Sequence, residues 1–143
     1  MTANSGEAVQ KNPWTVARLL ELFDVEADGQ DRYIAPTGIA DADERQVVEG
    51  TQVLAQVIVA AAKKRFGGKS IRSVHSVFAR AVLVGPPVIL DIDVVSEGGR
   101  STASAIVTAS QNDKRCMTFT VLADVPTRRH PPPPAAPRGR RAG

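Results

Sequence analysis

The chain has 143 residues, of which 43% are hydrophobic and 4% aromatic, and its formal net charge is +3. This length fits one domain with one hydrophobic core, built mainly from aliphatic side chains because aromatic residues are scarce. Five arginines lie after Thr127 with no acidic residue among them, so the rest of the chain is slightly acidic. That balance argues against a dedicated nucleic-acid-binding protein, which needs a basic face and usually stacking aromatic side chains.

Cysteine and histidine are too few for a disulfide framework or an evident metal site. Cys116 is the single cysteine, which rules out an internal disulfide and a cysteine-rich zinc site. The two histidines, His75 and His130, lie too far apart in the sequence to indicate a metal cluster, so we predict no metal. No cofactor is predicted. The first ten residues lack the features of a signal peptide, and no apolar run is long enough to span a membrane. A cytoplasmic location is expected.

The first predicted elements are a short helix and a short strand. Residues 1–11 are polar and are expected to be disordered. Asn12 and Pro13 form a typical helix start, with Asn as the N-cap and Pro at the first helical position. The helix ends near Asp24, and its apolar stripe consists of Val16, Leu19, Leu20 and Phe23. We expect this helix to pack as a lid at the edge of a sheet whose first strand is 31–35.

A long central helix dominates the middle of the chain. It opens at the pair Glu49 and Gly50 and continues as an almost wholly apolar run, which Gly67 and Gly68 break. Its helical spacing collects on one face Val53, Leu54, Val57, Ile58 and Ala61. Because alanines fill much of the remaining circumference, we expect this helix to be buried rather than to lie on a surface.

Strands are predicted after the Gly-Gly break over residues 70–84, 88–96, 101–111 and 115–124. The second and third of these strands alternate between apolar and polar residues. Their inward-facing residues are Val88, Leu90, Ile92 and Val94, followed by Ala103, Ala105, Val107 and Ala109. A strand, a long apolar helix and four antiparallel strands predict an α+β fold, a single hotdog in which one curved sheet wraps the helix. Apolar residues on both faces of several strands predict that such units dimerise.

From Thr127 onward the sequence is rich in proline and arginine. This composition favours polyproline II and disorder. A ligand for an SH3-type domain and an anion-binding arm are two functional interpretations, and a solvated terminus is the simpler one. The predicted domain organisation is a disordered N-terminus at 1–11, a folded hotdog domain at 12–126 and a Pro/Arg-rich disordered tail at 127–143.

Four segments of the chain form a set that is typical of one enzyme family. They are LLELFDVEADGQDRYIA near the start, EGTQVLAQVIVAA on the helix, SVHSVFARA on the following strand and QNDKRCMTFTVLADVP near the end. Together they resemble the first hotdog repeat of the acyl-CoA thioesterase II family, over roughly residues 14–126. The most specific matches are Gly50, Gln52 and Gln56 on the helix and the pattern His75-Ser76-x-Phe78-x-Arg80 on the strand.

The resemblance implies hydrolysis of fatty acyl-CoA to a free fatty acid and CoA. Members of this family typically carry two tandem hotdog repeats, and an Asp, a hydroxyl residue and a Gln, mainly in the second repeat, orient the attacking water. This chain matches only the first repeat, so two hypotheses stay open. One is an active single hotdog that works as a homodimer or a dimer of dimers. The other is a catalytically silent half that binds acyl-CoA or pairs with a complete thioesterase subunit.

A hotdog hydratase is a weaker third hypothesis, because the chain does not place an Asp and a His together at the spacing that such enzymes need.

Thioester hydrolysis requires an activated water and hydrogen-bond donors for the oxyanion that develops on the carbonyl. The start of the central helix supplies N–H donors and the positive end of a dipole. Glu49, Gln52 and Gln56 are spaced i, i+3 and i+7 and share a helix face, so they are the candidate catalytic residues, with Glu49 as general base. The competing interpretation is that Glu49 caps the helix and the glutamines line a subunit contact. Gly50 lets a backbone or a substrate approach the helix start closely.

The strand after the helix supplies further candidates for substrate binding. His75 and Ser76 are adjacent, so they point to opposite faces and cannot act as a Ser–His couple. A strand histidine is more often a hydrogen-bonded core or interface residue than a catalyst. Arg80 is suited to bind a CoA phosphate or to form an interface ion pair. Cys116 is expected to be a packing residue.

Overall fold

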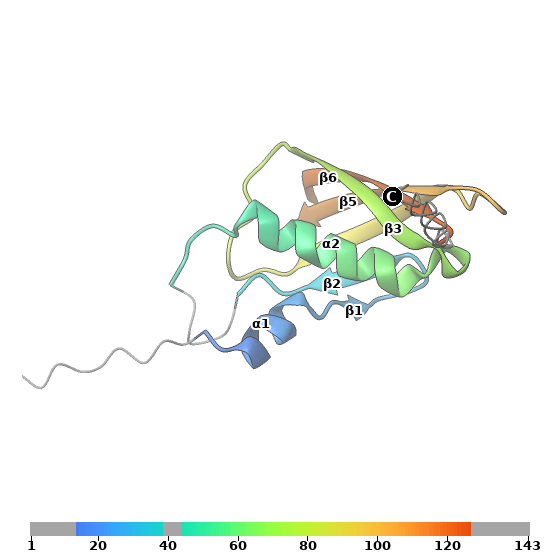
Figure 1. Ribbon diagram of the computed structural model, residues 1–143. Helices are drawn as coiled ribbons and strands as arrows, with labels where there is room; N and C mark the ends of the chain where they lie inside the picture. The colour runs from blue at the N-terminus through green and yellow to red at the C-terminus, as the bar shows by residue number, and fades with distance from the viewer. Residues whose placement is uncertain (1–13, 39–43, 127–143) are drawn as a thin grey trace, which may run out of the picture.

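The computed structural model describes residues 14–38 and 44–126. The predictions for residues 1–11, for the helix start at Asn12 and Pro13 and for the tail at 127–143 lie outside these residues. The elements, in chain order and drawn in Figure 1, are α1 (Val16–Phe23), β1 (Glu26–Ala27), β2 (Arg32–Ala35), α2 (Gly50–Lys64), a 3₁₀ turn (Phe66–Gly68), β3 (Ser70–Phe78), β4 (Val88–Ser96), β5 (Ala103–Gln111) and β6 (Lys114–Asp124).

The strands form one antiparallel sheet in the order β1-β2-β4-β5-β6-β3. The chain leaves β2 near one edge, crosses one face of the sheet through α2 and returns as β3 at the other edge (Figure 1). Between β2 and β4, Arg32 Nε donates a hydrogen bond to Asp91 Oδ1 at 2.7 Å, which raises the pKa of Arg32. The predicted α+β hotdog architecture, one long helix against one curved antiparallel sheet, is confirmed.

α2 places one apolar side in the core. Val53, Val57 and Ala61 have no exposed surface, as their spacing of four residues predicts. Leu54 is half-buried, whereas Ile58 is 40% exposed. The helix is therefore buried along one side and not all round. Among the described residues, no helix is long and apolar enough to cross a membrane.

The C-terminal end of α2 is tied to the segment around β1 and β2. Lys63 Nζ donates to Asp24 Oδ1 at 2.6 Å, and Lys64 pairs with Asp31. Both lysines lie in the last turn, where a positive charge also interacts favourably with the helix dipole. The helix ends at Arg65, which adopts the left-handed conformation with φ of 61°.

The central strands face the core with alternate residues, as predicted. Val88, Leu90 and Ile92 of β4 are buried. The fully buried residues of β5 are Ala103, Ala105, Val107 and Ala109. Phe119 of β6 is the largest fully buried side chain, so the core combines a small-residue strand with a neighbouring bulky one.

α1 differs from the predicted helix at its start. Thr15 is the N-cap, because its hydroxyl accepts a hydrogen bond from the Arg18 N–H at 3.2 Å. Leu22 is buried, whereas Leu20 on the outer side is 64% exposed. The helix lies beside α2 near β1, a two-residue edge strand that the sequence pattern did not predict (Figure 1).

β3 ends at Phe78 and not at residue 84 as predicted. The N–H groups of Ala79 and Arg80 both donate to the Cys116 carbonyl, at 2.9 and 3.0 Å, so the chain turns away from the sheet there. Beyond this turn, the segment that was predicted as strand pairs with residues just before α2.

The turn between β4 and β5 provides a test of the backbone geometry. Gly98 and Gly99 have positive φ angles of 71° and 46°. A Cβ on Gly98 would lie 1.8 Å from the Thr102 carbonyl oxygen, whereas a Cβ on Gly99 would meet nothing within 4 Å.

We predict that Gly98→Ala lowers the free energy of unfolding by about 2–4 kcal/mol and the matched control Gly99→Ala by about 1 kcal/mol. Urea denaturation measures both values, and equal losses would contradict this turn geometry.

Candidate functional site

A surface pocket lies where the start of α2 meets the end of β3. Its volume is about 290 Å³. Its lining includes Val48, Gly50, Phe78, Arg80, Val82 and Met117. The fold therefore brings together two of the predicted substrate-binding residues, Gly50 and Arg80, although they are far apart in the sequence. We refer to this hollow as the helix-start pocket.

The first turn of α2 carries unused hydrogen-bond donors. Glu49 is the N-cap residue, but its exposed side chain makes no capping hydrogen bond. Within the described part of the chain, the N–H groups of Gly50 and Thr51 meet no acceptor, whereas those of Gln52 and Val53 lie 3.0 and 3.4 Å from the Glu49 carbonyl oxygen. Free N–H groups at the positive end of a helix dipole favour a negative charge, whether bound or developing.

The residues before α2 are held by the segment that follows β3. The Val48 N–H donates to the Val82 carbonyl at 2.8 Å, and the Val84 N–H donates to the Gln46 carbonyl at 3.1 Å. These two bonds run in an antiparallel pattern around an isolated β-bridge. They fix the start of the helix relative to Val82, which forms one wall of the pocket.

Gln111 supports this contact from the end of β5. Its Oε1 accepts a hydrogen bond from the Leu83 N–H at 2.9 Å, and its Nε2 donates to the carbonyls of Leu83 and Pro86 at 2.8 Å each. Its side chain is almost fully buried. Sequence reasoning assigned Gln111 no role. The available signal was its position, because it continues the inward-facing register of β5 two residues after Ala109.

The two predicted catalytic glutamines hold α2 against the backbone. Gln52 Nε2 donates to the Thr37 carbonyl at 3.1 Å, and its Oε1 accepts a hydrogen bond from Arg45 at 3.1 Å. Gln56 has no exposed surface, and its Nε2 donates to the carbonyls of Leu22 and Pro36 at 2.7 Å each. Neither glutamine lines the helix-start pocket. Glu49 is exposed at the helix start and is not among the residues that line the pocket either.

Thr37 connects Gln52 of α2 with the segment that follows β3. It is only 3% exposed, and its hydroxyl accepts a hydrogen bond from the Gly85 N–H at 2.8 Å while its carbonyl accepts one from Gln52. Sequence reasoning missed Thr37 because it lies in a stretch that showed no periodic pattern. Its place next to the Pro36 carbonyl, which Gln56 binds, makes this short stretch a fixed part of the fold.

His75 and Ser76 point to opposite faces of β3, as predicted. His75 is exposed and lies across from Thr120 on the outer face of the sheet. Ser76 is half-buried and lies across from the fully buried Phe119, on the side that α2 covers. Neither residue lines the helix-start pocket. Cys116 is buried, which agrees with a packing position.

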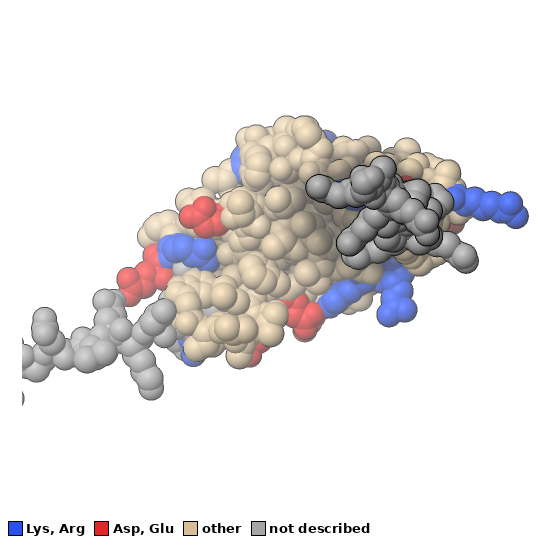
Figure 2. Space-filling model, viewed as in Figure 1, with Lys and Arg blue, Asp and Glu red and all other residues tan. Residues whose placement is uncertain are grey.

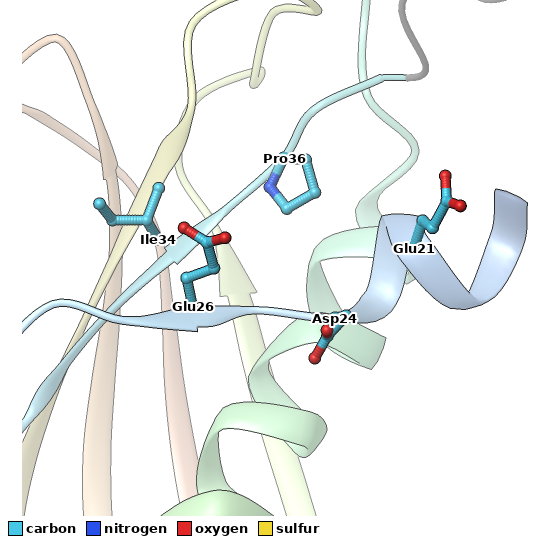
Figure 3. A pocket seen from close by; sticks show the side chains of 5 residues that line it. All are labelled: Glu21, Asp24, Glu26, Ile34 and Pro36. Carbon is cyan, nitrogen blue, oxygen red and sulfur yellow. The ribbon is translucent and has the colours of Figure 1, made fainter.

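A second hollow, of about 370 Å³, lies between α1 and the first two strands (Figure 3). It is lined by Glu21, Asp24, Glu26, Ile34 and Pro36. Figure 3 shows the three carboxylates set apart around the hollow rather than converging on one point. Asp24 is also paired with Lys63. In the described ranges 14–38 and 44–126, no group of three or more His, Cys, Asp or Glu residues has the arrangement of a metal site.

The sequence matches the family described as acyl-CoA thioesterase N-terminal domain over residues 41–123. The chain belongs to this family. The match covers the central helix and the strands that build the helix-start pocket, so the pocket is part of a thioesterase-family domain. No curated protein matches the chain in sequence.

Solved structures of mycobacterial proteins share the fold of this chain. The tesB protein MAP1729c of Mycobacterium avium subspecies paratuberculosis is 28% identical, with a TM-score of 0.69 over 87% of this chain and 49% of that protein. The acyl-CoA thioesterase II TesB2 of Mycobacterium marinum is 20% identical, with a TM-score of 0.65 over 85% and 44% of the two chains. This thioesterase-family chain spans about half the length of these mycobacterial proteins.

A protein that this chain covers over most of its length shares the fold as well. A Thermus thermophilus thioesterase, solved in complex with coenzyme A and Zn, is 15% identical, with a TM-score of 0.57 over 68% of this chain and 80% of that one. At this identity the likeness shows the fold alone.

The contacts of Gln56 predict a large effect on stability. Gln56→Leu keeps the size of the side chain but leaves the buried Leu22 carbonyl and the partly buried Pro36 carbonyl without their donor. We expect it to lower the free energy of unfolding by about 2–4 kcal/mol. Gln46→Leu replaces an exposed glutamine and serves as the matched control, with an expected change within about 0.5 kcal/mol. Chemical denaturation with comparison of midpoints tests this. A Gln56 variant as stable as the control would contradict the structural role of these two hydrogen bonds.

Proposed function

We propose that the chain is an acyl-CoA thioesterase that hydrolyses fatty acyl-CoA to a free fatty acid and CoA. Membership of the acyl-CoA thioesterase family supports the reaction class. The observation that carries the proposal for this chain is the helix-start pocket, which Gly50 lines together with apolar residues and Arg80. The unused N–H groups of Gly50 and Thr51 belong to the first turn of the helix that begins there.

The chemistry follows from these groups. A water oxygen attacks the thioester carbonyl carbon while a base takes its proton, and the oxyanion that forms accepts hydrogen bonds from the Gly50 and Thr51 N–H groups. The carbon–sulfur bond then breaks, the CoA thiolate leaves and takes up a proton, and the acid is released. Glu49 is the proposed base, because its carboxylate lies at the same helix start and makes no capping hydrogen bond. This route uses no cofactor.

The same pocket offers contacts for both ends of the substrate. Val48, Val82 and Met117 provide apolar surface for the acyl group. Arg80 is exposed and carries a guanidinium, the group best suited to bind phosphate oxygens of CoA. The proposed substrate contacts are therefore Gly50 and Arg80, with Gln52 and Gln56 acting as positioning residues for the helix.

We also propose that two copies of the chain assemble through β3. This strand is the last in the sheet order, so one side of it has no neighbour within the described chain, and its Val77 is 55% exposed. The face that carries α2 and β3 shows few charged side chains, which gather toward its margins in Figure 2. Unpaired strand edges and apolar patches favour association. Relatives about twice as long match this chain over half their length, which is consistent with a second unit.

A catalytically silent module that binds acyl-CoA, or that pairs with a complete thioesterase subunit, is the second candidate function. The observation that favours it is the use of both glutamine amides in structural hydrogen bonds, which leaves Glu49 without a side chain beside it to orient a water. The helix-start pocket serves binding on either proposal.

Association through β3 predicts that the protein is at least a homodimer. Light scattering of the purified chain should give a mass of two copies or a multiple of two. Val77→Lys places a charge on the free edge strand and should shift the protein toward the monomer. Ile106→Lys is the control inside the sheet, because Ile106 is 38% exposed but lies on β5 and pairs on both sides, with Asp93 of β4 and Thr120 of β6, and it should keep the assembly. A well-folded wild-type monomer would contradict the proposal.

The catalytic proposal predicts release of CoA thiol from acyl-CoA, followed with a chromogenic thiol reagent. Glu49→Gln should lower kcat by on the order of 10²-fold or more, as expected for a lost general base. Glu97→Gln changes an exposed carboxylate on the far hairpin and should have no effect. Gln52→Ala and Gln56→Ala should cost less than Glu49→Gln when the assembly is retained.

Thermal melts with and without acyl-CoA separate the two candidate functions. A wild-type protein that is stabilised by acyl-CoA but shows no turnover would establish the binding module. The absence of both turnover and stabilisation would exclude both functions for the chain on its own.

A further inference from the structure

The Phe78 ring lies directly on the start of α2. A Cβ built on Gly50 would be 2.3 Å from Phe78 Cε1 and 3.0 Å from Cζ, far inside contact distance. Any side chain at position 50 would therefore have to displace the ring. Gly50 lacks a positive φ angle, so a side chain there would meet the ring and would not strain the backbone.

Phe78 differs from the other apolar residues of the helix-start pocket in its exposure. Val48, Val82 and Met117 are at most 5% exposed. Ala79 and Ala81 also line the pocket, but their side chains are small. Phe78 is 57% exposed, although large aromatic side chains usually gain by burial. Phe78 is therefore the large apolar side chain of this pocket that stays accessible to a ligand.

The ring also stands next to the groups that the reaction would use. Gly50, which the ring covers, carries one of the two unused N–H groups, and Arg80 lies two residues after Phe78 in the sequence. An acyl group that brings its carbonyl to the start of α2 must therefore pack against the ring or fit beside it, while the anionic part of the ligand reaches the guanidinium.

We propose that Phe78 is a specificity-determining residue, whose ring limits the size of the acyl group that can bring its thioester to the start of α2. This inference rests on the proposed function of the same pocket. Shortening the side chain enlarges the apolar wall space next to Gly50 and should favour longer acyl groups. Differences of one methylene in an apolar pocket change selectivity by about 10-fold or more, so the loss of a ring should give a clear change of profile.

The test compares wild type, Phe78→Leu and Phe78→Ala on acetyl-, hexanoyl-, dodecanoyl- and hexadecanoyl-CoA. Both kcat/KM and the thermal stabilisation by each ligand are measured, so that a protein which binds without turnover is still informative. We expect the ratio of long-chain to short-chain values to rise at least about 10-fold in Phe78→Ala, with a smaller rise in Phe78→Leu. Leu20→Ala, which shortens a similarly exposed side chain on α1, is the control and should keep the wild-type profile.

A double-mutant cycle tests the contact itself. Gly50→Ala should displace the ring, lower the melting temperature and weaken binding of every acyl-CoA, whereas Gly50→Ala combined with Phe78→Ala should recover much of both losses. Additive effects in this cycle would overturn the contact.

The outcomes distinguish this inference from the proposed function. A wild-type protein that neither binds nor hydrolyses any acyl-CoA overturns both. If wild type binds or hydrolyses acyl-CoA and folded Phe78→Leu and Phe78→Ala keep its chain-length profile, only the role of Phe78 is overturned.

Discussion

The position of α2 depends on one buried amide, that of Gln56. Its Nε2 donates to the Leu22 carbonyl at the end of α1 and to the Pro36 carbonyl just after β2. A single side chain without exposed surface thereby joins both helices to the segment after β2, and its bond to the Leu22 carbonyl is buried, where an unpaired carbonyl is costly. The helix cannot slide along the sheet without breaking both bonds, so the depth at which its first turn meets the strands is fixed.

The same first turn is left with free donors because of its capping residue. Ser, Thr, Asp or Asn at the N-cap would turn a short side chain back onto the N–H groups that follow. Glu49 does not do so, and the Gly50 and Thr51 N–H groups find no other acceptor among the described residues. Donors at a helix end that no side chain caps bind water or a ligand, so these two N–H groups are available to an acceptor that enters the pocket.

The sequence predicted those parts of the structure that follow from local periodicity. Alternation along β4 identified Val88 and Leu90 as core residues, because a period of two converts directly into one buried face. The resemblance pointed to Gly50 and Arg80, which the fold brings to one pocket. The role of Gln111 was not predictable in this way, because its three hydrogen bonds reach a segment whose position depends on tertiary folding. The end of β3 at Phe78 was not predictable for the same reason, because it depends on tertiary contacts of the residues that follow.

The location of the helix-start pocket links the proposed chemistry to the proposed assembly. Phe78 is the last residue of β3, so the strand whose edge is free also carries a wall of the pocket. A second copy that pairs with this edge would bury Val77 and stand beside the open side of the pocket at the same time. Apolar burial would then drive the association, and the same contacts would remove water from around the thioester and strengthen its hydrogen bonds to the helix start. A monomer would have the donors but not the enclosure.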